Sequence, residues 1–420
     1  MKVCVIGSGG REHTIAWRLS ISPSVEAVYA VPGSDAMNDV AKSIAEDWTD
    51  TEMLIATLRD HSVDLVVIGP EAPLVAGLAD ELRKANIPVF GPSKSAAQLE
   101  GSKVFAKNLM KKYDIPTAAY GVFSDVLEAK AFIERIGAPI VVKADGLAAG
   151  KGVVVAMTVA EAYDAVDDML SGNRFGEAGS TVVIEEFMMG EEASLLAFVD
   201  GTTVVPMIAS QDHKRIFDGD KGPNTGGMGT YAPAPVLTDE LRDVAMRTIL
   251  EPMVKALAAE GMPYVGCLYA GLMITDEGPK VVEFNARFGD PETQVVLPLL
   301  DGDLGEIMMD CATGSLSPDK VKWKEGSAAC VILASKGYPE TSSKGDLIEG
   351  NVRSDENTFI FHSGTRFDGD HFVTNGGRVL GVVGLGNDLK NALHIAYNRV
   401  EMITFDGMQY RKDIGAKAFK

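Results

Sequence analysis

Three polar residues alternate along one predicted strand and give the first chemical signal in the chain. Glu283, Asn285 and Arg287 are separated by apolar residues within a run rich in β-branched and aromatic side chains. Because successive side chains of a strand point to opposite faces, these three share one face. A carboxylate and a carboxamide suit a hard cation such as Mg²⁺, and a guanidinium suits a phosphate or a carboxylate. The solvated face of an antiparallel sheet would show the same pattern.

A glycine-rich loop, residues 144–152, joins two further predicted strands at 140–143 and 153–156. A Walker-type loop would open a helix and end in Lys-Ser or Lys-Thr, so that type of site is excluded. A loop flanked by Lys143 and Lys151 can instead fold over a polyphosphate as a lid and supply cations. The alternative is an ordinary hairpin loop with surface lysines.

Strands and helices alternate up to residue 90, which predicts a doubly wound parallel sheet with its ligand edge in the loops after the strands. The loop at 7–10, Gly-Ser-Gly-Gly, is not a dinucleotide fingerprint, because Glu12 stands where the third glycine belongs. Its N–H groups still suit an anion or a sugar, unless it is only a tight turn. Glu71 is a candidate acceptor for sugar hydroxyls, or else an acid favoured at a helix start.

Composition narrows the class of protein. The chain has 420 residues and a net charge of −20, which argues against non-specific binding to nucleic acid or to an anionic membrane. Its four cysteines are too scattered for a metal site or a disulfide framework. We see no signal peptide and no apolar run of membrane-spanning length, so we expect a cytoplasmic α/β protein, monomeric or weakly dimeric.

Helices are expected over 74–85 and 91–113, and a long glycine-rich segment at 222–229 has the composition of a functional loop. After about residue 325 the sequence becomes rich in strands, with one helix, and Asn-Gly-Gly at 375–377 predicts a hairpin turn.

Several of these segments together resemble the ATP-grasp superfamily and, within it, the phosphoribosylamine–glycine ligase (glycinamide ribonucleotide synthetase) family. The resemblance covers the whole chain, and only the loop at 218–220 departs from the family pattern. Its carriers are residues 9–13, 69–74, 98–103, 143–152, 184–187, 210–215, 222–229, 283–285, 287–292, 374–378 and 410–415.

The resemblance implies three domains. Residues 1–103 would form a Rossmann-like domain, residues 104–324 a two-lobed ATP-grasp domain with a lid at about 121–190, and residues 325–420 a small α+β domain. It also implies the reaction: ATP, glycine and 5-phosphoribosylamine give glycinamide ribonucleotide, ADP and phosphate through a glycyl phosphate, in purine biosynthesis. Charge neutralisation and water exclusion are what such a phosphoryl transfer needs.

Carried over by position, the resemblance assigns roles to individual residues. The metal, Mg²⁺ or Mn²⁺, would be held by Glu283 and Asn285, and the catalytic residues would be Arg287, Asp290 and Lys214. The expected ATP-binding residues are Lys103, Lys143, Gly146, Gly150, Lys151, Gly152, Glu185, Glu186, Phe187 and Glu192. The expected substrate-binding residues are Gly9, Gly10, Glu71, Asp212, Gly226, Gly227, Arg287, Asp290, Arg378 and Lys412.

Some alternatives stay open at this point. Glu192 has the alternative of a solvated acid, and Arg378 and Lys412 that of interface residues. No nucleophile pattern accompanies His13 or His213, so neither is assigned a catalytic role. The competing functions are an ATP-grasp ligase or carboxylase with another acceptor, and a nucleotide-binding module without activity.

Overall fold

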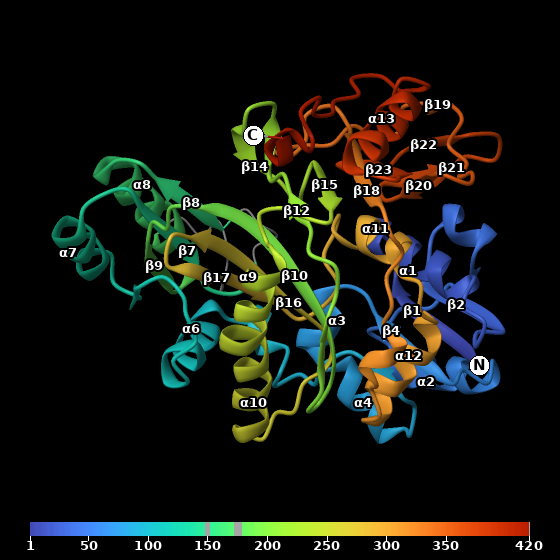
Figure 1. Cartoon of the computed structure of the whole chain (residues 1–420), viewed down its shortest axis with the longest axis horizontal. Helices are drawn as coiled ribbons and strands as arrows, with labels where there is room; N and C mark the ends of the chain where they lie inside the picture. The colour runs from blue at the N-terminus through green and yellow to red at the C-terminus, as the bar shows by residue number, and fades with distance from the viewer. Residues whose placement is uncertain (148–151, 172–178, 420) are drawn as a thin grey trace.

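The computed structural model describes residues 1–147, 152–171 and 179–419. Within these residues the chain forms four sheets of four or five strands and three two-stranded ribbons. In Figure 1 the N-terminal sheet lies at the right, the lid region with α7 (Val126–Ile136) at the left, and the C-terminal elements at the top. No helix of this described part is long and apolar enough to cross a membrane.

The N-terminal strands form one parallel sheet in the order β3-β2-β1-β4-β5. Strands β1 and β4 are buried along their apolar runs, as expected for a sheet covered on both faces, and this confirms the predicted doubly wound arrangement. The elements are β1 (Lys2–Gly7), α1 (Gly10–Ser20), β2 (Ala27–Pro32), η1 (Asp35–Asp39), β3 (Lys42–Ser43), α2 (Thr51–Asp60), β4 (Leu65–Ile68), α3 (Glu71–Ala76), α4 (Leu78–Lys84) and β5 (Val89–Phe90).

Two expected helices are each divided in the structure. The helix predicted over 74–85 breaks at Gly77, whose φ of +102° lies in the left-handed region and separates α3 from α4. The helix predicted over 91–113 begins only at Gln98, because residues 91–97 are not helical, and it breaks at Ser102, which has an extended backbone. Its hydroxyl accepts from the Phe105 N–H and so starts α6 (Lys103–Lys112) afresh after α5 (Gln98–Gly101).

The lid region is an antiparallel sheet in the order β6-β9-β7-β8, with α7 and α8 packed against it. Its own apolar cluster includes Ile133, Val142, Ala165 and Ile184. Strands β7 and β8 pair directly, so the predicted strand–loop–strand is confirmed for the residues described. The elements are β6 (Tyr120–Phe123), β7 (Ile140–Ala144), β8 (Val153–Ala156), α8 (Val159–Leu170) and β9 (Val182–Glu186).

A central antiparallel sheet, β11-β10-β16-β17, carries the predicted metal ligands. Glu283 pairs with Gly271 and Asn285 with Tyr269, so both side chains leave the same face. The register shifts between Gly271 and Leu272, and Val281, which pairs with Leu272, is fully buried. The elements are β10 (Glu191–Asp200), β11 (Val204–Pro206), α9 (Asp239–Ala245), η3 (Met246–Leu250), α10 (Glu251–Ala259), β16 (Val265–Thr275) and β17 (Gly278–Asn285).

The C-terminal sheet, β12-β15-β18-β23-β20, combines strands from two stretches of the chain. Strand β12 (Gln211–Asp212) and strand β15 (Gly229–Ala232) precede α9, and β15 pairs with β18 (Ser327–Ala334) across the proposed 324/325 boundary. The ribbon of β13 (Arg215–Phe217) and β14 (Lys221–Asn224) lies between β12 and β15 in sequence. Figure 1 shows these elements beside the C-terminal region.

The remaining elements correct one expectation. Residues 375–377 do not form a hairpin turn, because β22 pairs with β21 whereas β23 pairs with β18 and β20. The elements are α11 (Thr293–Val296), η4 (Leu297–Leu299), α12 (Leu304–Thr313), η5 (Pro318–Lys320), β19 (Glu349–Gly350), β20 (Thr358–His362), β21 (Thr365–Phe367), β22 (Phe372–Thr374), β23 (Arg378–Gly386), α13 (Leu389–Val400), β24 (Ile403–Thr404) and η6 (Ala416–Phe419).

Candidate functional site

Glu283 and Asn285 lie at the end of β17 on a face that is open to solvent, and the Glu283 side chain is 36% exposed. Asn285 Oδ1 accepts from Nη2 of Arg287 at 3.3 Å. Among the described residues, no group of three or more His, Cys, Asp or Glu side chains could hold a metal. One carboxylate and one amide oxygen nevertheless fit Mg²⁺, which takes its other ligands from water and from substrate phosphates.

Three lysines surround Glu283. Nζ of Lys214 lies 3.8 Å from Oε1 of Glu283, and Nζ of Lys143 donates to the Val282 carbonyl at 3.0 Å. Burial opposes ionisation of Glu283, but Lys214, Lys143 and Lys103 hold its pKa below the usual value. We refer to Glu283, Asn285, Lys103, Lys143 and Lys214 as the β17 face.

Lys143 belongs to a buried ion-pair triad with Glu185 and Lys107. Glu185 places Oε1 3.0 Å from Nζ of Lys143 and Oε2 3.0 Å from Nζ of Lys107. Burial lowers the pKa of Lys107 to about 8, although Glu185 opposes this, and its ammonium also donates to the Thr117 hydroxyl at 2.8 Å. The Glu185 carboxylate therefore orients Lys143 toward β17, a role that the sequence did not indicate.

The loop that follows β7 is tied to the start of α6. Nζ of Lys103 donates to the Gly146 carbonyl at 2.8 Å, and the Asp145 carboxylate accepts from the Val104 N–H at 3.1 Å. Burial lowers the pKa of Lys103, while Glu283 opposes the change. Gly152 is buried at the end of the loop. Gly150 and Lys151, both predicted to bind ATP, lie outside the described residues.

The segment expected to meet adenine and ribose is partly engaged by the protein itself. The Glu186 N–H donates to the Ala119 carbonyl at 2.9 Å, and its carboxylate accepts from the Ala119 N–H at 3.1 Å. Phe187 follows the end of β9 and is half-buried. Glu192, on β10, lies 3.1 Å from Nζ of Lys214, so it borders the β17 face as an exposed partner of that lysine.

Arg287, predicted to bind a phosphate or a substrate carboxylate, already has protein partners. Within the described residues it makes four hydrogen bonds: to Glu71, Glu100 and Asn285, and to the Phe288 carbonyl. Its distances to the carboxylates are 3.3 Å for Glu71 and 2.7 Å for Glu100. Glu71 likewise has a protein partner, so a sugar hydroxyl would have to share it.

Glu100 is a site residue that the sequence reasoning missed. It lies 187 positions before Arg287, and its other oxygen accepts from the Ala286 N–H at 2.7 Å. Burial raises its pKa, while Arg287 opposes the change. The signal was an acid between Leu99 and Gly101, within one of the segments that carry the family resemblance.

Asp290 and Arg378 form a second charged group near the glycine-rich loop. Oδ2 of Asp290 lies 3.1 Å from Nη2 of Arg378, and Oδ1 accepts from the Gln294 amide at 2.7 Å. Burial disfavours the Asp290 carboxylate, but Arg378 holds its pKa below the usual value. Nη1 of Arg378 donates to the Gly226 carbonyl at 2.7 Å, which joins the loop to this group.

Gly227 permits close contact between that loop and Asp212. Its φ is +114°, and a Cβ there would overlap Pro291 and come within 2.8 Å of the Asp212 carboxylate. Burial and the nearby Glu292 raise the pKa of Asp212 well above its ordinary value. Glu292 accepts from the Tyr269 hydroxyl at 2.5 Å.

The side chain of Glu12 occupies the N-terminal loop at residues 7–10. Glu12, which replaces the third glycine, accepts from the Gly9 N–H at 2.8 Å, so that donor already has a partner. Gly10 lies against Ser363 of the C-terminal region, and a Cβ at Gly10 would overlap that hydroxyl. The backbone N–H of Lys412 donates to Asp218 at 2.8 Å, and its side chain is exposed.

Comparison with known families covers almost the whole chain. Residues 1–100 match the model described as phosphoribosylglycinamide synthetase, N domain. Residues 101–293 match the ATP-grasp (A) domain of the same enzyme and residues 328–417 its C domain. The chain belongs to the phosphoribosylglycinamide synthetase family. The resemblance expected from its motifs is thereby confirmed.

Relatives of this family are similar along their full length. A phosphoribosylamine–glycine ligase of Halalkalibacterium halodurans is 52% identical, over 100% of this chain and 97% of the relative. One of Vibrio cholerae is 50% identical, over 100% of this chain and 98% of the relative.

Solved structures confirm the fold. The crystal structure of phosphoribosylamine–glycine ligase from Thermotoga maritima superposes with a TM-score of 0.87 at 34% identity, covering 99% of this chain and 100% of that one. A biotin carboxylase domain from Hydrogenobacter thermophilus has a TM-score of 0.75 at 16% identity, and the match covers 97% of this chain and 91% of that one. This second similarity shows a shared fold only.

Proposed function

We propose that this member of the phosphoribosylglycinamide synthetase family is a phosphoribosylamine–glycine ligase. It joins glycine to 5-phosphoribosylamine with ATP and releases glycinamide ribonucleotide, ADP and phosphate, a step of purine biosynthesis. Relatives that carry this name are about half identical along the whole chain. The observation that carries the proposal is the β17 face, where three lysines surround a partly exposed carboxylate.

In the first step, an oxygen of the glycine carboxylate attacks the γ-phosphorus of ATP. The new bond gives glycyl phosphate, and the bond to the bridging oxygen breaks to release ADP. Lys103, Lys143 and Lys214 oppose the charge that accumulates on the phosphoryl oxygens. Glu283 and Asn285 would hold Mg²⁺ or Mn²⁺, which when bound neutralises further phosphate charge.

In the second step, the amine of 5-phosphoribosylamine attacks the acyl carbon. A C–N bond forms, the C–O bond to phosphate breaks, and the amine proton leaves with the released phosphate. Because water would hydrolyse the acyl phosphate, the segment at 222–229 must cover the site during this step. The contacts from Gly226 to Arg378 and from Gly227 to Asp212 support this role.

The substrate assignments use charged groups that already have protein partners, which the substrates would share. Asp290 would receive the glycine ammonium, whereas Arg287 orients Asn285 and adds positive charge near the glycine carboxylate. The phosphoribosylamine would lie between Gly10, Glu71 and Arg378, where the N- and C-terminal regions meet. The exposed side chain of Lys412 would add positive charge toward the phosphate of phosphoribosylamine.

We also propose that the protein works in the cytoplasm as a monomer or weak dimer, and that residues 1–103, 104–324 and 325–420 are its domains. Strands β15 and β18 pair in one sheet although they lie on opposite sides of the 324/325 boundary. This boundary therefore divides the sequence but not the sheet.

Omission of single substrates tests the function. ADP release is followed with ATP and Mg²⁺, first with glycine alone, then with 5-phosphoribosylamine alone, then with both. The ligase requires both for sustained turnover, with one ADP per glycinamide ribonucleotide. Turnover that depends on bicarbonate and biotin, or on another amine, would replace this proposal with another ATP-grasp activity, and absence of turnover would favour a binding module.

A further inference from the structure

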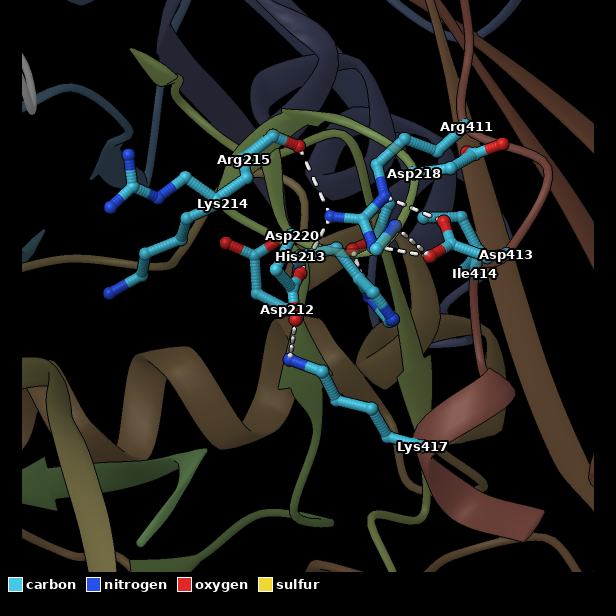
Figure 2. Close-up of polar contacts among 12 residues, drawn as sticks. Asp212, His213, Lys214, Arg215, Asp218, Asp220, Arg411, Asp413, Ile414 and Lys417 are labelled. Atoms are coloured by element: carbon cyan, nitrogen blue, oxygen red, sulfur yellow. Dashed lines mark hydrogen bonds and ion pairs between the residues drawn. The ribbon is translucent and has the colours of Figure 1, made fainter. Parts of the chain in front are cut away.

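The C-terminal end of the chain reaches back to the segment that carries Asp212 and Lys214 (Figure 2). At its centre is Arg411, which is only 1% exposed. Its Nε and Nη2 each donate to the Asp413 carboxylate at 2.8 Å, and its Nη1 donates to Oδ1 of Asp220 at 2.8 Å. Lys417 adds an ion pair to Oδ2 of Asp220 at 2.8 Å. We name these four residues the clasp.

The clasp holds the turn between β13 and β14 from several sides. Asp413 also accepts from the Gly219 N–H at 2.8 Å, and Nη1 of Arg411 also donates to the Arg215 carbonyl at 3.2 Å. A two-stranded ribbon this short is marginally stable by itself. Its position therefore depends on these contacts with the C-terminal segment.

His213, the residue before Lys214, contacts both the C-terminal segment and strand β15. It is 1% exposed, its Nε2 accepts from the Gly415 N–H at 3.3 Å, and its Nδ1 donates to the Gly229 carbonyl at 3.1 Å. Burial, reinforced by the charges of Arg411 and Lys417, lowers the pKa of His213 to about 4. The ring is thus neutral near pH 7, which suits one donor and one acceptor.

Hydrogen bonds connect the β13–β14 ribbon to Lys214 and to the loop at 225–227. The Lys214 carbonyl accepts from both the N–H and the hydroxyl of Thr225, each at 2.8 Å. The same hydroxyl accepts from the Gly227 N–H at 3.0 Å. In Figure 2 the Lys214 side chain points away from the clasp. The backbone of Lys214 and the loop at 225–227 are therefore fixed by one ribbon.

We propose that Arg411, acting through Asp220 and Asp413, is a positioning residue for the ligation reaction. It holds the β13–β14 ribbon while glycyl phosphate exists. Lys214 then stays beside Glu192 and Glu283, and residues 225–227 stay beside Asp212 and Arg378. This inference rests on the proposed function. Arg411 is buried, whereas its partners Asp220 and Asp413 are 39% and 28% exposed. Ion pairs of a buried arginine add little stability over apolar packing, so we assign the clasp a role in fixing geometry.

Replacement of Arg411 by Met tests the proposal, with Arg399→Met as the matched control. Arg399 is a second buried arginine of the C-terminal region, but its partners are Asp355 and the Arg353 carbonyl, outside the clasp and the ribbon. We expect R411M to lower kcat on the order of 10- to 100-fold, as small misplacements do, with the KM for ATP nearly unchanged.

A second readout separates positioning from simple stability. In R411M, water should reach glycyl phosphate, so ADP release should exceed glycinamide ribonucleotide formation, whereas R399M should keep the two equal. Arg411→Lys should recover part of the coupling. Equal coupling and equal kcat in R411M and R399M, at matched thermal stability, would overturn the proposal.

Trypsin gives a test that does not need activity. Cleavage after Lys214, Arg215 and Lys221 in the native protein, followed by mass spectrometry, should be faster in R411M than in R399M. If R411M fails to fold, Asp220→Asn takes its place, because it removes one partner and leaves Arg411 paired with Asp413. Unchanged cleavage in the folded variant contradicts the clasp, whereas an inactive wild type contradicts only the proposed function.

Discussion

The β17 face and the clasp are both dense in charge, but they arrange it differently. In the clasp, Arg411 and Lys417 each lie 2.8 Å from a carboxylate oxygen of Asp220. On the β17 face, the cation nearest to the Glu283 carboxylate within the described residues is Lys214, at 3.8 Å. Charges matched at contact distance fix a shape, whereas charges held apart leave room for a ligand between them.

Exposure separates Arg411 from the β17 face, but not the whole clasp. Arg411 is 1% exposed, while the side chains of Glu283 and Lys214 are 36% and 33% exposed. Asp220 and Lys417 of the clasp are 39% and 31% exposed, so the pairing of their charges at contact distance, and not burial, distinguishes the clasp. The triad of Lys107, Glu185 and Lys143 combines both features, because it is buried and matched yet presents Lys143 to the open face.

The largest effect should come from breaking this triad. Glu185→Gln removes the charge between two buried lysines, and we expect a loss of about 3–5 kcal/mol in the free energy of unfolding. Urea unfolding followed by tryptophan fluorescence measures it. Glu81→Gln, which breaks the exposed pair with Lys84, is the control and should leave stability unchanged. Equal stability of E185Q and the wild type would show that the triad is not a structural unit.

Replacement of Glu283 should separate activity from stability most clearly. Glu283→Gln removes a metal ligand from an open face, so we expect kcat to fall roughly 10²-fold while the melting temperature stays the same. Initial rates over a range of Mg²⁺ and Mn²⁺ concentrations measure it. The control is Glu277→Gln, at the turn of the same hairpin, where the side chain is 77% exposed. An active E283Q would exclude Glu283 as a ligand.

Asp290 should give a smaller effect, confined to one substrate. Asp290→Asn keeps the shape but removes the charge proposed to receive the glycine ammonium, and we expect the KM for glycine to rise roughly tenfold. The KM for ATP should change little, as should both values in the exposed control Asp319→Asn. An equal rise for ATP and glycine would mean that Asp290 acts on the whole loop through Arg378.

Local sequence patterns were sufficient for the parts of the site that lie on single elements. The alternation at Glu283 and Asn285 predicted their shared face, and the apolar runs around Lys143 predicted a strand pair with a loop. Both depend only on the two-residue period of a strand. Gly77 and Ser102 divided expected helices, because apolar periodicity continues across a residue that changes the backbone direction.

Long-range pairing could not be predicted in the same way. Arg287 meets Glu100 across 187 positions, and Arg411 meets Asp220 across 191. Nothing in the local pattern distinguishes a free guanidinium from one already paired by a distant carboxylate. The loop at 218–220, which we expected to depart from the family pattern, provides Asp220 as a partner of Arg411.

The two histidines that the sequence left without a catalytic role predict a pH dependence of stability. Burial lowers the pKa of His13 to about 3 and of His213 to about 4, and the neighbouring His362 is also lowered to about 4. Below about pH 6.5 these histidines bind protons in the unfolded chain but not in the folded one. Their contribution to the free energy of unfolding is therefore fully present above that pH and falls as the pH is lowered toward 4.

The last prediction isolates one of these groups. His13 accepts from the His362 N–H at 3.0 Å, and His13→Asn keeps an acceptor there while removing the titration. Between about pH 6.5 and pH 5 the wild type should lose roughly 2 kcal/mol more than the variant, at about 1.4 kcal/mol per pH unit. Urea unfolding at both pH values measures this difference, with the exposed His394→Asn as the control. Parallel losses in H13N and the wild type would mean that His13 binds protons in the folded protein as readily as in the unfolded chain, and that its pKa is not lowered by this contact between the N- and C-terminal regions.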